Sequence, residues 1–163
     1  MNRIGLIVNP VAGLGGRVGL KGSDGLAIQR KAVELGGQPH AGERAAQALQ
    51  VLLPLASQFK LLTYPSTMGA EAAEQAGIHP HVLGFIKPGQ TSAEDTARAA
   101  GEMVGKKVGL ILFTGGDGTA REGCGELHLR GSLRRVGRGD LAGSDVIGWR
   151  TAAVAASRSP RAR

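Results

Sequence analysis

This sequence of 163 residues contains a single cysteine, Cys124. An internal disulfide is therefore excluded, and we expect a reducing, cytoplasmic environment. No apolar run is long enough to span a membrane, and the amino-terminal run stops at Asn9-Pro10, too early for a signal peptide. Aromatic residues make up 3% of the chain, which argues against a nucleic-acid partner that stacks its bases on the protein.

Lysine is missing from the last part of the chain, where arginine supplies the charge. Residues 1–120 carry eleven Lys and Arg against nine Asp and Glu, whereas residues 121–163 carry nine arginines and four acids. The net charge of +7 therefore comes mostly from the tail. We expect an α/β domain over 1–122 and, over 123–163, an irregular basic tail with the composition of a GC-rich gene read out of frame.

Short apolar runs alternate with amphipathic segments along the first domain. This alternation predicts a Rossmann-like parallel sheet of about four strands, with helices on both faces and right-handed crossovers. Ligands bind such sheets at the carboxyl ends of the strands. The loops after Val8, Tyr64 and Phe113 are therefore expected to meet there. The strands are expected over 3–8, 59–64, 81–86 and 108–113, and the helices over 26–35, 43–56, 65–77 and 91–104, the last with a capping box of Thr91 and Glu94.

The segment 108–119 places three glycines and one aspartate directly after a predicted buried strand. A bare Gly-Gly-Asp-Gly sequence is typical of a plain turn, but the preceding strand and the following Thr119 favour a site. Glycines let the backbone approach a ligand closely, and exposed N–H groups there suit a phosphate. Asp117 is placed to hold a metal ion or to accept a proton from an attacking hydroxyl.

A second glycine-rich segment, 13–25, follows the first predicted strand. The dinucleotide fingerprint fails because Val18 stands where a glycine or alanine is required, and the P-loop pattern fails around Lys21. The spacing alone thus leaves open whether this loop contacts a ligand. His79 with His81, and Cys124 with His128, lack the further ligands that a metal site needs.

Four segments together resemble the ATP–NAD kinase family, in its acetoin-catabolism-X-like branch, and more distantly the diacylglycerol and sphingosine lipid kinases. The similarity covers roughly residues 1–122. The segments that carry it are 4–16 (Ile-Gly-Leu-Ile-Val-Asn-Pro, then Ala-Gly-Leu-Gly-Gly), 20–25 (Leu-Lys-Gly-Ser-Asp-Gly), 91–96 (Thr-Ser-Ala-Glu-Asp-Thr) and 113–121 (Phe-Thr-Gly-Gly-Asp-Gly-Thr-Ala-Arg).

The resemblance implies phosphoryl transfer from ATP or another phosphate donor to the 2′-hydroxyl of NAD, with Mg²⁺ or another divalent cation. It assigns to Asp117 the activation of the acceptor hydroxyl or the binding of the cation. Residues implied to line the nucleotide are Gly115, Gly116, Gly118 and Thr119, and on the donor side Asn9, Gly13, Gly15 and Gly16.

The resemblance also implies a second, largely β domain after the motif, and nothing in residues 123–163 resembles its start. We therefore expect a truncated or frameshifted kinase whose partners are small nucleotides, with association into a homo-oligomer left open. Two alternatives remain: a non-catalytic nucleotide-binding or interaction module, and a lipid-kinase-like phosphotransferase.

Overall fold

A computed structural model describes residues 2–12, 14, 26–87, 89, 91–115, 133–137 and 145–150. Its centre is a sheet with strand order β3-β2-β1-β4-β6-β5. The strands are β1 (Asn2–Val8), β2 (Phe59–Thr63), β3 (His81–Val82), β4 (Leu110–Gly115), β5 (Leu133–Gly137) and β6 (Asp145–Arg150). The first four are parallel, which confirms the predicted α/β fold.

Two stretches of the segment that we expected to be irregular form strands instead. β6 pairs with β4 in antiparallel register, from Leu110↔Arg150 to Gly115↔Asp145, and β5 pairs with β6. The expectation failed because these short, arginine-containing runs show no clear alternation. β6 takes its place in the sheet by backbone pairing with β4, a strand that the sequence marks strongly, and β5 takes its place by pairing with β6.

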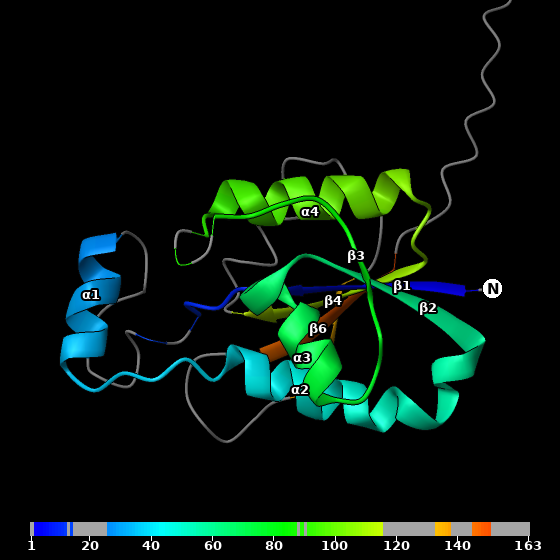
Figure 1. Cartoon of the computed structure of the whole chain (residues 1–163), viewed down its shortest axis with the longest axis horizontal. Coiled ribbons are helices and arrows are strands. Elements are labelled where there is room, and N and C mark those ends of the chain that lie inside the picture. Colours follow the sequence, from blue (N-terminus) through cyan, green and yellow to red (C-terminus); the bar gives the residue numbers. More distant parts are fainter. Residues whose placement is uncertain are drawn as a thin grey trace, which may run out of the picture.

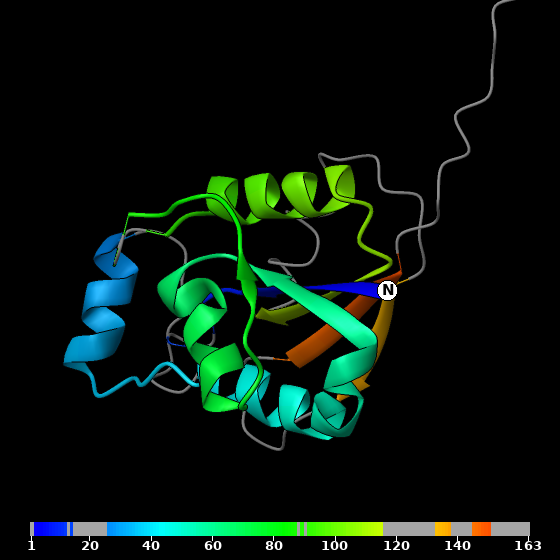
Figure 2. The ribbon, with the colours of Figure 1, turned by 45° about the vertical axis from the view of Figure 1, so that its right-hand side comes forward.

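Helices cover both faces of the parallel strands, as predicted (Figure 1). α2 (Ala41–Leu52) and α3 (Ala70–Gln75) lie on one face, and α4 (Ala93–Gly105) lies on the other. α1 (Leu26–Glu34) stands to one side of the sheet, and the turned view in Figure 2 shows the same separation.

Alternate residues of the buried strands supply the two halves of the core, as the two-residue period of a strand requires. Leu6 and Val8 of β1 pack with α2 and α3, whereas Ile7 packs with Met103 of α4. Gly5 has to be small, because a Cβ there would lie 2.5 Å from the Met103 sulfur atom.

Among the predicted element boundaries that differ from the structure, three are explained by a proline or a glycine. The helix expected over 43–56 ends at Leu52 and continues as the 3₁₀ helix η2 (Leu53–Gln58), which has Pro54 in its first turn. The helix expected from residue 65 is split by Gly69 into η3 (Ser66–Met68) and α3. The strand expected over 81–86 stops early, because the chain turns at Gly84 with a φ of 55°.

The capping box of α4 is displaced by one residue from its predicted position. Ser92, not Thr91, is the N-cap, and its side chain accepts a hydrogen bond from the Asp95 backbone. Asp95, not Glu94, reaches back and accepts from the Ser92 N–H at 2.9 Å. Both pairs fit the residue types of the motif, so the sequence alone could not distinguish them.

Candidate functional site

The chain order in the sheet reverses between β1 and β4. From β1 the chain moves outward to β2 and β3, and α4 then returns it over the opposite face to β4. Such a reversal leaves a crevice outside the carboxyl ends of the two central strands, and α/β proteins bind ligands there. The candidate site therefore lies between the ends of β1 and β4, and it involves two of the three loops that we predicted to meet at this edge.

The loop after β1 is fixed to the end of β4 by backbone hydrogen bonds. The Asn9 N–H donates to the Thr114 carbonyl at 2.8 Å, which continues the pairing of Val8 with Thr114. The Asn9 side-chain oxygen accepts from the Val11 N–H at 3.1 Å, and the Asn9 carbonyl accepts from Ala12 at 3.1 Å. Asn9 is thus a turn residue that shapes the loop, since an Asn side chain stabilises such a turn through its own backbone.

Buried apolar residues anchor the same loop to the domain. Ala12 and Leu14 are each 4% exposed. Gly37, just after α1, packs so closely that a Cβ would lie 3.0 Å from the Leu14 carbonyl oxygen. The loop therefore has a fixed base at the crevice, which a site for a charged ligand requires.

β4 delivers the glycine-rich motif to this crevice. The strand extends two residues beyond its predicted end, so Gly115 is its last residue and is buried. Of the predicted site residues, the structure brings Asn9 and Gly115 to the same sheet edge on neighbouring strands. The other predicted site residues lie outside the described residues: Gly13, Gly15, Gly16, Gly116, Asp117, Gly118 and Thr119.

Thr114 is a feature of this edge that the sequence analysis did not single out. Its side chain is fully buried, and the hydroxyl has no hydrogen-bond partner among the described residues. Buried polar atoms are nearly always paired, so an orphan hydroxyl next to the motif is consistent with a polar ligand group at this crevice. Only a structure reveals such an atom, because threonine in a strand is otherwise unremarkable.

In the loop after β2, as in the loop after β1, the backbone N–H groups already donate within the protein. The N–H groups of Met68, Gly69 and Ala70 donate to the carbonyls of Pro65, Ser66 and Tyr64. Gly69 is required there, since a Cβ would lie 2.0 Å from the Thr63 hydroxyl oxygen, in a backbone conformation with a φ of 141°. This third loop is therefore a closed turn beside the crevice.

A polar cluster flanks the crevice on the α4 side. Arg98 forms an ion pair with Asp95, donates to the Phe85 carbonyl at 3.1 Å, and lies over the Phe85 ring at 5.4 Å from its centroid. Burial acts to raise the pKa of Asp95, but hydrogen bonds from Ser92 and the Arg98 guanidinium outweigh it and hold that pKa below its ordinary value. The cluster stabilises the start of α4 rather than presenting a free carboxylate.

The fold defines an α/β domain with a topological switch point, the place where such sheets bind ligands. The family model described as "ATP-NAD kinase N-terminal domain" matches residues 4–128, most of the chain, and the chain therefore belongs to that family. A comparison with curated proteins gave no match.

The family implies ATP and NAD as substrates and usually a divalent cation. Among the described residues at the crevice, the unpaired Thr114 hydroxyl is consistent with a polar ligand group there. For the cation, the described residues contain no group of three His, Cys, Asp or Glu side chains that could hold it. Within the same part of the chain, no helix is long and apolar enough to cross a membrane.

Proposed function

We propose that the chain carries the phosphoryl-transfer site of an ATP-dependent NAD kinase, in the acetoin-catabolism-X-like branch. The observation that supports this most is the position of Gly115. It ends β4 beside the loop that Asn9 fixes, so the Gly-Gly-Asp-Gly-Thr motif starts at the switch point of the sheet. The Lys-Gly-Ser-Asp-Gly segment at 21–25 favours this branch over the lipid kinases.

In this proposal each residue has a role that phosphoryl transfer requires, namely positioning and charge stabilisation. The glycines Gly115, Gly116 and Gly118 let backbone N–H groups approach the phosphates, and Thr119 adds a hydroxyl. Asp117, two residues after Gly115 in the sequence, accepts the proton of the NAD 2′-hydroxyl as that oxygen attacks the terminal phosphorus of ATP. The bond from this phosphorus to the bridging oxygen breaks, and ADP leaves. A divalent cation, when bound, neutralises phosphate charge, and Asp117 is the residue proposed to hold it.

The first test is the replacement Asp117→Asn, assayed by NADP formation from ATP and NAD. We expect a rate at least roughly 10³-fold lower, because the amide cannot accept the proton. Glu74→Gln, an equally conservative change at an exposed position of α3, is the control and should leave the rate unchanged. Equal thermal stability of the two variants would show that the loss is chemical. Unchanged activity of the Asn variant would refute the role of Asp117.

Binding measurements on the same samples separate the alternatives. A chain that binds ATP without forming NADP is a nucleotide-binding module, and phosphorylation of diacylglycerol in place of NAD would identify a lipid kinase.

A further inference from the structure

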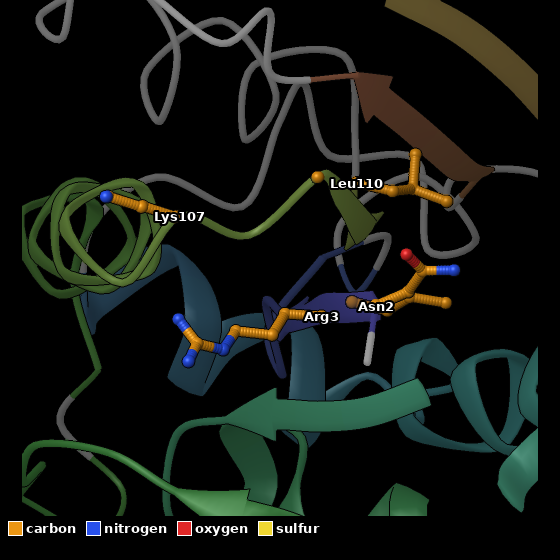
Figure 3. Close-up of a pocket in the computed structure, with 6 residues that line it drawn as sticks. Asn2, Arg3, Lys107 and Leu110 are labelled. Carbon is orange, nitrogen blue, oxygen red and sulfur yellow. The ribbon is translucent and has the colours of Figure 1, made fainter. Parts of the chain in front are cut away.

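A pocket of about 440 Å³ opens at the amino edge of the sheet, opposite the candidate site (Figure 3). It is lined by Asn2, Arg3, Ile4, Lys107, Gly109 and Leu110. These residues begin β1 and β4, whereas Asn9 and Gly115 mark the other ends of the same strands. With β1 spanning seven residues, the two sites lie roughly 20 Å apart. One small ligand cannot occupy both.

Positive charge is concentrated around this pocket. Arg3 and Lys107 line it, and Figure 3 shows their side chains extending to the same side. Lys106 precedes Lys107 in the sequence. Lys60 of β2 is the register partner of Arg3, so Lys60 and Arg3 face the same side of the sheet, the side that α4 covers. These four cations are exposed, and none forms an ion pair within the part of the chain that the structure describes.

Lys107 occupies a backbone conformation that ordinarily belongs to glycine. Its φ is 56°, and it stands at the position just after the end of α4. The Lys107 N–H donates to the Val104 carbonyl, and the Val108 N–H donates to the Met103 carbonyl, which is the Schellman arrangement. A residue with a side chain is less stable in this conformation than in the right-handed one, so glycine would suit the backbone better. Strain of this kind points to a use for the side chain.

The carbonyl groups at the end of α4 do not oppose a bound anion strongly, because they already have donors. Besides the two Schellman bonds, the Lys106 N–H donates to the Glu102 carbonyl, and the Arg3 guanidinium donates to the Lys106 carbonyl at 2.6 Å. That last bond also fixes Arg3 at the rim of the pocket. A guanidinium held in place loses less entropy when it binds a phosphate than a free side chain does.

We propose that this pocket binds a chain of phosphate groups, the class to which inorganic oligophosphates and the tail of a nucleoside triphosphate belong. Its volume suits a small ligand, and several cations on separate elements match the several negative charges of such a chain. The site is distinct from the phosphoryl-transfer crevice and does not depend on it.

The test is a titration of the full chain with inorganic triphosphate at low salt, followed by the backbone amide signals in NMR. We expect shifts at Lys107 and Gly109 of the amino edge that saturate independently of any shift at Asn9 and Gly115. Lys107→Gly is the main variant. It should raise the melting temperature by about 2–4 °C, because it relieves the strained conformation, yet weaken triphosphate binding at least about three-fold.

Lys60→Gln is the second variant, since it removes a charge without changing the α4 terminus, and it should weaken binding to a similar degree. Lys31→Gln, at an exposed position in the last turn of α1, is the matched control and should leave the affinity unchanged. A parallel titration with ATP identifies the source of the phosphates: tighter binding than triphosphate indicates a nucleotide, and equal binding indicates the phosphate chain alone.

Three outcomes would overturn the proposal. Shifts confined to Asn9 and Gly115 would place the only phosphate site at the crevice. An equal loss of affinity in the Lys31 control would show general charge attraction. Tighter binding of duplex DNA than of triphosphate at the same amides would indicate a nucleic-acid surface instead. None of these outcomes bears on the Asp117 assay, so the two proposals stand or fall separately.

Discussion

Tyr64 illustrates how a single buried polar atom constrains its surroundings. The side chain is fully buried, and the hydroxyl has no hydrogen-bond partner among the described residues. Burial, with a smaller contribution from the nearby Glu102 carboxylate and against the opposing effect of Arg98, raises the pKa of Tyr64 to about 12. Gly84 is required beside the ring, because a Cβ there would lie 2.6 Å from the Tyr64 hydroxyl oxygen.

Replacing Tyr64 with phenylalanine should therefore leave the free energy of unfolding unchanged or raise it by up to about 1 kcal/mol, since removing an unpaired buried hydroxyl relieves a desolvation cost. Thr63→Val is the control, because the Thr63 hydroxyl does donate, to the Leu6 carbonyl at 2.9 Å. In the Thr63→Val variant the free energy of unfolding should fall by about 1 kcal/mol. Urea denaturation measures both values. A loss above about 1 kcal/mol in the Phe variant would mean that the hydroxyl is bonded.

The start of α4 makes stability depend on pH. Asp95 accepts hydrogen bonds from the Ser92 backbone and side chain and pairs with Arg98, and its pKa is lowered. A lowered folded-state pKa means that the stabilisation is present above the unfolded value of about 3.9 and is lost as the pH falls through the folded value. The contribution of this capping box should therefore be complete at neutral pH.

We expect Asp95→Ala to lower the free energy of unfolding by about 1 kcal/mol at pH 7, and the difference from the native chain to shrink below about pH 4. Glu94→Ala is the matched control, because Glu94 is the neighbouring acid in the same turn and the one that the sequence motif suggested. Thermal denaturation at several pH values gives both differences. A larger cost at Glu94 than at Asp95 would support the register predicted from the sequence over the observed one.

The elements that the sequence predicted well are those that a local pattern specifies. The apolar runs at Ile4–Val8 and Leu110–Phe113 identify buried strands, and Gly36-Gly37 marks the end of α1. The boundary of β3 was missed because Gly84, where the chain turns, packs against the ring of Tyr64, the residue that follows β2. Local patterns do not encode such contacts between distant residues.

The strand order is the part of the whole molecule that the sequence could not give. The switch point exists because β1 pairs with both β2 and β4, through Ile4↔Leu61 and Ile4↔Leu110. The Asn9 loop and the motif at Gly115 could each be recognised separately, but not their contact through Thr114. The amino-edge pocket could not be predicted from the sequence either, since the contact between Arg3 and Lys106 joins residues 103 positions apart.

In the whole sheet, β6 pairs with the edge of β4 that β1 leaves open. Without it, the buried run Ile111-Leu112-Phe113 would present an unpaired edge, and such edges recruit other strands. In a chain shortened to residues 1–128, the free energy of unfolding should therefore fall by more than about 2 kcal/mol, because several backbone hydrogen bonds are lost and each contributes about 1 kcal/mol. The melting temperature should fall by roughly 4–8 °C, and ultracentrifugation should show association that increases with concentration.

The matched control is a chain ending at residue 152, which keeps both added strands and removes only the last arginine-containing stretch. It should match the full chain in melting temperature and in sedimentation. If the 1–128 chain also stays monomeric with an unchanged melting temperature, then β6 does not pair with β4 in solution. The four parallel strands, with their helices, would in that case form a complete stable unit, and the edge of β4 would need another explanation for its protection.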